Sequence, residues 1–110
     1  MEKIIEGWKS TDSKNINRAL NILRAINHPL RKQIVTLLNE KPGLSVTGVY
    51  VKLRQEQSVI SQHLAILRRA KVVNATRNWK YIHYSVNHEK LGLISDVSKR
   101  LAAWVGPKEN

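Results

Sequence analysis

The side chains best suited to recognising another molecule lie between residues 57 and 70. Apolar residues recur in this segment at helical spacing, as Ile60, Leu64 and Leu67, which predicts an amphipathic helix. The rest of the helix carries hydrogen-bonding and cationic side chains without a carboxylate, at Gln57, Ser58, Ser61, Gln62, His63, Arg68 and Arg69. Of these, His63 lies nearest to the predicted core. Glutamine can pair with adenine through two hydrogen bonds, and serine can reach a base or a phosphate, so this surface suits the major groove of DNA.

The charge of the chain points to the same class of partner. The sequence has 19 Lys and Arg residues against 8 Asp and Glu, a net charge of +11. Such an excess attracts polyanions, with nucleic acid first and an anionic membrane surface second. No Asp or Glu occurs between Gln57 and His88, whereas that stretch carries the cations Arg68, Arg69, Lys71, Arg77 and Lys80. The alternative is an ordinary solvated helix face in a basic protein.

Other classes of protein receive little support. The chain has no cysteine, which excludes disulfides and thiolate metal sites. Its carboxylates are scattered and nothing pairs a nucleophile with a base, so we expect neither an enzyme nor a cofactor. No stretch approaches the ~20 apolar residues of a membrane span, and residues 1–7 lack a secretory apolar core. We therefore expect a cytoplasmic protein that does not bind membranes.

The elements that must position these side chains form one domain over residues 12–105, with a short arm at 1–11 and a tail at 106–110. The fold class is mainly α with a β-hairpin wing, in the order α-α-α-α-β-β-α. We expect helices at 12–26, from Pro29 to the Pro42-Gly43 stop, at 45–53 with Ser45 as its cap, at about 57–70 and at 91–104, and strands at 72–77 and 81–86.

Two short helices joined by a tight turn, at 45–53 and 57–70, predict a helix-turn-helix. The second helix would place its N-terminal residues against base edges in the major groove. The hairpin would then form the wing of a winged helix-turn-helix, with Arg77 and Lys80 on phosphates. Its tip carries Trp79, which either lies over the DNA or folds back onto the domain.

Three segments resemble the ArsR/SmtB family of bacterial winged-helix repressors. Residues 57–73 are similar to the family's recognition helix, with its Ser-x-x-Ser-x-His-Leu-x-x-Leu pattern. Residues 28–35 resemble the opening of its second helix, and residues 81–86 resemble its second wing strand. The resemblance covers roughly residues 16–104.

This resemblance implies a homodimer, formed by the first and last helices, that binds an operator near a promoter and releases it on sensing a signal. We expect the operator to be an inverted repeat of double-stranded DNA. The apolar side chains compatible with the dimer interface are Leu20, Leu23, Ile94, Val97, Leu101 and Trp104. Alternatively, both apolar faces close the core of a monomer.

The resemblance also implies where a metal would bind, and here the residues differ from the family pattern. The Cys-x-Cys pair of the third helix is matched by Ser45 and Thr47, which do not bind soft metals. The final-helix site is matched by His88, Lys90, Leu101 and Trp104, of which His88 alone is a ligand type. We expect no metal at these sites, and the sequence leaves the effector open.

Two other functions remain as alternatives to a sequence-specific repressor. A nonspecific architectural DNA- or RNA-binding protein would bind all sequences with equal affinity. A protein-interaction module that uses the last helix would hold its partner even at high salt.

Overall fold

The computed structural model describes residues 10–105, apart from the side chains of 10–12, 101, 102, 104 and 105. These residues form five helices and three strands, which confirms the predicted fold class. In chain order they are α2 (Ser10–Ile26), α3 (Pro29–Glu40), β1 (Leu44–Ser45), α4 (Val46–Leu53), α5 (Gln57–Arg69), β2 (Val73–Asn78), β3 (Tyr81–Val86) and α6 (His88–Val105).

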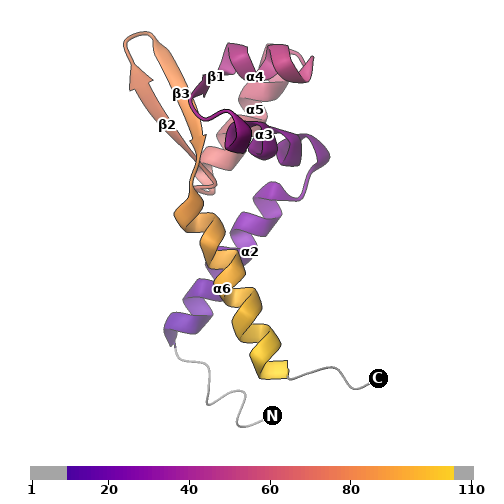
Figure 1. Ribbon diagram of the computed structural model, residues 1–110, viewed down its shortest axis with the longest axis vertical. Helices are drawn as coiled ribbons and strands as arrows, with labels where there is room; N and C mark the ends of the chain where they lie inside the picture. Colours follow the sequence, from indigo (N-terminus) through magenta and orange to yellow (C-terminus); the bar gives the residue numbers. More distant parts are fainter. Residues whose placement is uncertain (1–9, 106–110) are drawn as a thin grey trace.

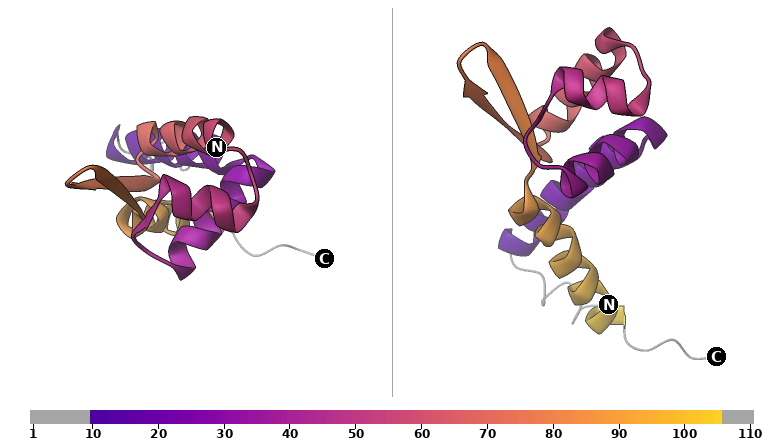
Figure 2. Two further views of the ribbon diagram at one scale, coloured as in Figure 1. Left: turned by 90° about the horizontal axis from the view of Figure 1, so that it is seen from above. Right: turned by 45° about the horizontal axis from the view of Figure 1, so that its top comes forward.

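The elements divide between two ends of the molecule. The hairpin of β2 and β3 and the helices α4 and α5 lie at one end, whereas α2 and α6 pack against each other and cross at the other (Figure 1). Helix α3 lies between them and contacts α2, α4 and α5. The right-hand view of Figure 2 shows the same separation of the hairpin from the outer end of α6.

The core sits under α5 and determines how this helix is rotated. The predicted stripe of Ile60, Leu64 and Leu67 is fully buried. It packs with side chains from every neighbouring element, among them Ile22, Ile34, Leu38, Val49, Val72 and Val73. Burying a large aliphatic side chain contributes about 1.5–3 kcal/mol. Rotating α5 about its axis would expose three such residues at this cost. The core packing therefore keeps the opposite face of α5 turned toward solvent.

One strand of the sheet was not predicted. Strand β1 pairs antiparallel with β3, with Leu44 opposite Tyr84 and Ser45 opposite His83, and the sheet order is β1-β3-β2. The left-handed backbone of Gly43 (φ 86°) turns the chain into this strand. The Gly43 amide donates to the Tyr84 carbonyl at 2.9 Å, and His83 Nδ1 lies 2.9 Å from the Gly43 carbonyl oxygen. Strand β1 has only two residues, too few to show the alternation of apolar and polar side chains that predicts a strand. The predicted element order therefore lacked it.

Several element boundaries also differ from the prediction. Helix α2 begins at Ser10, so the last two residues of the predicted arm are helical, whereas residues 1–9 and the tail lie outside the described residues. Helix α6 begins at His88 rather than at 91, because Asn87 Oδ1 accepts a hydrogen bond from the Lys90 amide at 3.2 Å and so caps it. The predicted Ser45 cap is confirmed, since its Oγ accepts from the Gly48 amide at 3.2 Å.

A polar cluster joins the start of α3 to helix α5. His28 caps α3, with its Nδ1 accepting from the Leu30 amide at 3.1 Å. Its ring centroid lies 4.6 Å from that of His63 on α5. Arg31 donates through Nε to the Ala25 carbonyl, and its Nη1 lies 3.3 Å from His63 Nδ1. Partial burial of His63, together with the charges of His28 and Arg31, lowers the pKa of its imidazole.

This cluster predicts how stability depends on pH. Because the folded pKa of His63 lies below its ordinary value of 6.5, the unfolded chain takes up the proton first as the pH falls. The free energy of unfolding should therefore decrease below about pH 6.5. We expect His63→Gln, which keeps a hydrogen-bonding group, to lose less stability than the wild type between about pH 8 and about pH 5. Urea unfolding at each pH measures this, and parallel curves for both proteins would contradict it.

Candidate nucleic-acid interface

Helix α5 presents a continuous polar surface on the side away from the core. Gln57, Ser58, Ser61 and Gln62 are all exposed in its first two turns, as are Ala65, Arg68 and Arg69 further along. Their predicted orientation is therefore confirmed. A short connection leads into this helix from α4, which ends because Arg54 adopts the left-handed conformation (φ 54°). Because Ile60, Leu64 and Leu67 fix the inner face of α5 in the core, the side chains of its first two turns on the opposite face are exposed to solvent.

Two of the predicted DNA-contacting residues differ from the others in position, since His63 lies behind this surface and Arg69 lies at its far end. His63 is half-buried and contacts His28 and Arg31, so it lies behind the exposed face. Arg69 is exposed but is eleven residues beyond Ser58, about 16 Å along the helix axis. It borders a surface hollow that α2 shares, lined by Asn21, Arg24, Ala25, Ile66, Arg69 and Ala70. The exposed hydrogen-bonding residues thus gather in the first two turns.

The hairpin carries its cations at a tight, exposed tip. Asn78 pairs with Tyr81, so the turn consists of Trp79 and Lys80 alone. Arg77 Nε donates to the Trp79 carbonyl at 3.2 Å, and Lys80 Nζ lies 5.5 Å from the centroid of the Tyr81 ring. The Trp79 side chain is 88% exposed. Of its two predicted positions, folding back onto the domain is therefore wrong for the free protein.

None of the five cations between Gln57 and His88 forms an ion pair with a carboxylate in the part of the chain that the structure describes. Unpaired cations on one surface repel one another and leave a positive potential around it. A polyanion relieves that repulsion, whereas a neutral ligand does not.

A further pair of cations lies near α4 and was missed in the sequence. The nearby side chain of Lys41, through its polar group and its charge, lowers the pKa of the Lys52 amine. Lys41 follows α3 and Lys52 lies in the last turn of α4. They are eleven residues apart in the chain, and the packing of α3 against α4 brings them together, so no local pattern could have revealed them. Two adjacent ammonium groups are suited to bridging a phosphate.

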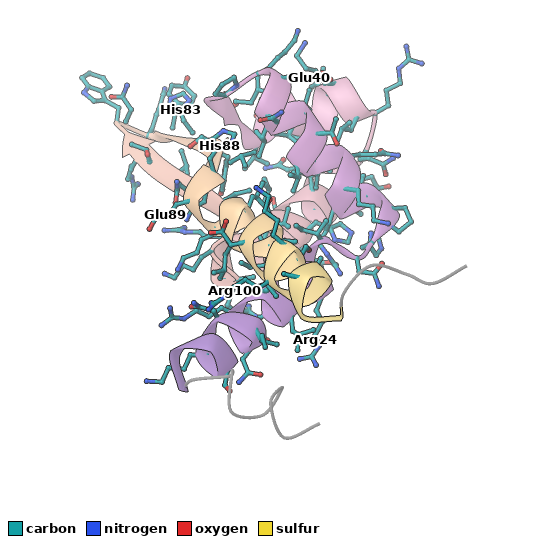
Figure 3. The ribbon with its side chains drawn as sticks, turned by 60° about the horizontal axis from the view of Figure 1, so that its bottom comes forward. Arg24, Glu40, His83, His88, Glu89 and Arg100 are labelled. Atoms are coloured by element: carbon teal, nitrogen blue, oxygen red, sulfur yellow. The ribbon has the colours of Figure 1, made fainter. Side chains whose placement is uncertain are left out.

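The remaining histidines occupy separate structural positions. His83 lies beside the Gly43 carbonyl, whereas His88 and Glu89 lie in the first turn of α6 (Figure 3). Ser45, at one matched metal position, uses its hydroxyl to cap α4. Across residues 10–105, no three His, Asp or Glu side chains converge as a metal site would require. None of the described helices is long and apolar enough to cross a membrane.

The residues predicted for a dimer interface divide into three groups. Leu20 and Leu23 on α2 project outward, with 42% and 45% of their surfaces exposed. On α6, Val97 is buried and Ile94 is half-buried within the same chain. Leu101 and Trp104 lie outside the described side chains. Among the described residues, an exposed apolar strip of α2 thus remains beside the α2–α6 packing.

Known proteins are similar to this chain in sequence and in fold. Residues 28–75, from the cap of α3 into β2, match the family model described as "Bacterial regulatory protein, arsR family". The chain is 38% identical over 74 residues to the transcriptional repressor PagR of Bacillus anthracis, covering 66% of this chain and 74% of PagR. It is 32% identical over 88 residues to the transcriptional activator HlyU of Vibrio cholerae, covering 80% and 81% of the two chains.

The structural comparison agrees with the sequence comparison. The solved structure of HlyU from Vibrio cholerae has a TM-score of 0.64 at 32% identity and covers 82% of this chain and 97% of HlyU. An ArsR-like regulator from Rhodococcus sp. RHA1 has a TM-score of 0.74 at 19% identity, covering 80% and 82%, which shows a shared fold. The chain therefore belongs to the ArsR family of winged helix-turn-helix, DNA-binding transcriptional regulators, a class of proteins that are not enzymes.

Proposed function

We propose that this protein binds an inverted-repeat operator as a homodimer and represses transcription from the cytoplasm. The observation that carries the proposal is the exposed face of α5, which combines hydrogen-bonding side chains with unpaired cations and no carboxylate. The hairpin lies at the same end of the molecule (Figure 1), so α5 can enter the major groove while the hairpin follows the adjacent backbone.

Each part of this surface takes a different role. Ser58, Ser61 and Gln62 read base edges, because they are exposed in the first two turns of α5. Phosphates are held by the cations Arg68 on α5, Arg77 and Lys80 on the hairpin, and the Lys41–Lys52 pair near α3 and α4. The neutral amide of Gln57, at the start of α5, donates to a further phosphate. His63 acts indirectly, since its contacts with His28 and Arg31 fix α5 against α3. Arg69 contributes only electrostatic attraction to the phosphate backbone of the DNA.

Dimerisation is assigned to the opposite end of the molecule. Two copies of the exposed α2 strip, with Leu20 and Leu23, meet across a two-fold axis and continue onto α6 through Ile94, Leu101 and Trp104. Val97 is already buried within its own chain and supports this face from beneath. This leaves both α5 helices free and sets them about one DNA turn, roughly 34–36 Å, apart. A dimer bound over a promoter blocks access of the polymerase, which is how we expect repression to arise.

The signal that releases the DNA is not assigned to the family's known metal sites. The chain has no cysteine, and thiolates are what soft metals prefer. Ser45 is already engaged as a helix cap.

The alternative function is nonspecific DNA or RNA binding. It differs from the proposed function in one measurable property, because such a protein would bind all sequences with equal affinity.

Selection from a pool of random duplexes tests the proposed base reading. The wild type should select an inverted repeat, and Gln62→Ala should lose preference at one symmetric base pair of each half-site, by about 1–3 kcal/mol. Gln33→Ala is the matched control, because Gln33 is exposed on α3. If the wild type selects no consensus, or if both variants select the same repeat with equal strength, the assignment of α5 is wrong.

The salt dependence of binding tests the proposed phosphate contacts. With about 6–10 contacts, affinity should fall by roughly 10³–10⁵ between about 50 and 200 mM salt. Lys80→Ala and Lys52→Ala should each weaken all sequences alike and reduce the slope by about two in a dimer, one for each lost contact. Lys99→Ala is the control, because Lys99 is exposed on α6, away from the proposed DNA-binding surface, and it should leave the slope unchanged. Fluorescence anisotropy of labelled duplexes measures the slopes, and an equal effect of Lys99→Ala would refute these assignments.

Sedimentation tests the proposed dimer. Leu20→Glu combined with Leu23→Glu should give folded monomers, because both leucines are already exposed in the single chain while a dimer would bury their carboxylates. Operator affinity should then drop sharply, since one half-site supplies half of the contacts. Val51→Glu, at an apolar residue 60% exposed on α4, should remain dimeric. A monomeric wild type at tens of micromolar, or a dimeric double variant, would disprove this interface.

A further inference from the structure

Trp79 at the tip of the hairpin is the least buried large apolar side chain among the described residues, at 88% exposure. Its backbone is also unusual, because φ is 63° at the first of the two turn residues. Glycine, or asparagine and aspartate, ordinarily occupy such a left-handed position, and a bulky side chain there is a rare exception.

Neither feature stabilises the free protein. An exposed indole gains nothing from burial, and the left-handed conformation disfavours any residue with a large side chain. Backbone conformations of this kind tend to persist where a function needs the residue. The observation thus calls for a partner that buries the indole in the complex.

The hairpin presents this indole in a defined position. The strands pair in register up to the turn, with Arg77 opposite Ile82 and Asn78 opposite Tyr81. The hydrogen bond from Arg77 Nε to the Trp79 carbonyl closes the tip, and the neighbouring Lys80 ammonium lies over the Tyr81 ring. The exposed indole therefore belongs to a hairpin tip that also carries the cations Arg77 and Lys80.

The chemistry of this tip favours one partner. No Asp or Glu occurs between residues 57 and 88, so the tip is suited to a surface that is anionic at its edges and apolar within. The minor groove of duplex DNA has that arrangement, with phosphates on both rims and sugars and stacked bases between them. Apolar side chains that enter this groove partly unstack a base step and bend the duplex.

Resting on the proposed function, we infer that Trp79 is an aromatic wedge that enters the minor groove beside each half-site and bends the operator. The indole inserts at a base step while Arg77 and Lys80 hold the flanking phosphates. Such insertion is easiest at flexible pyrimidine–purine steps. Trp79 would therefore add sequence preference at positions that α5 does not touch.

Two substitutions at this position separate the wedge from the turn. Trp79→Asn removes the aromatic ring and keeps a residue that tolerates the left-handed backbone, so the protein should be at least as stable as the wild type. Its affinity for the selected duplex should fall about tenfold, and the bend measured by energy transfer between dyes at the duplex ends should decrease. Trp79→Phe should restore most of both. Wild-type affinity and bend in Trp79→Asn would overturn the inference.

A second measurement observes the indole directly. The chain has three tryptophans, Trp8, Trp79 and Trp104, so the emission of Trp79 in the wild type is obtained as the difference from Trp79→Phe. Adding the selected duplex should quench its emission in step with the anisotropy of labelled DNA, because the ring stacks on bases. Bound DNA with unchanged emission would overturn the wedge while leaving the proposed function intact. Failure to bind any duplex would instead refute the proposed function.

The same protein distinguishes a membrane surface from DNA. Vesicles of phosphatidylcholine and phosphatidylglycerol should leave the Trp79 emission unchanged at the salt concentration where the duplex quenches it. A blue shift with these vesicles, together with no response to duplex, would identify the tip as a membrane contact and overturn the inference.

Discussion

Burial of Ile60, Leu64 and Leu67 is the interaction on which the rest of this structure depends. These side chains anchor α5 to a core contributed by α2, α3, α4 and the sheet. When one apolar stripe of a helix is buried in the core, the rotation of the helix is fixed, and so is the set of residues on its exposed face. The exposure of Ser58, Ser61 and Gln62 is thus a direct consequence of apolar packing beneath them. The surface that we propose for DNA recognition is therefore fixed by hydrophobic packing.

A second constraint is that the cationic surface of α5 and the hairpin lies far from the α2–α6 end, through which we propose that two copies associate. The unpaired cations of α5 and the hairpin repel one another, which disfavours a compact chain of net charge +11. The structure places them at the end away from the α2–α6 crossing (Figure 1), where they face solvent in the free protein. Two copies can therefore associate through α2 and α6 without bringing these surfaces together. The same arrangement would give the proposed dimer one broad cationic side.

The sequence was sufficient for features that depend on local pattern. Helical periodicity identified the buried stripe of α5 and its outer face, and the cap at Ser45 followed from residue type. What it missed arises between elements distant in the chain. The β1–β3 pairing, the His28–His63 contact and the Lys41–Lys52 pair all require the tertiary fold. The exposure of Trp79 could not be decided from composition, because a tryptophan near a turn packs inward as readily as outward.

The central claim is that α5 lies in the major groove of two half-sites while the hairpins lie in the flanking minor grooves. Protection of the operator against dimethyl sulfate tests it most directly, since this reagent methylates guanine N7 in the major groove and adenine N3 in the minor groove. We predict two patches of protected guanines about one helical turn apart, flanked by protected adenines. Uniform reactivity along a duplex that is saturated with protein would contradict the account.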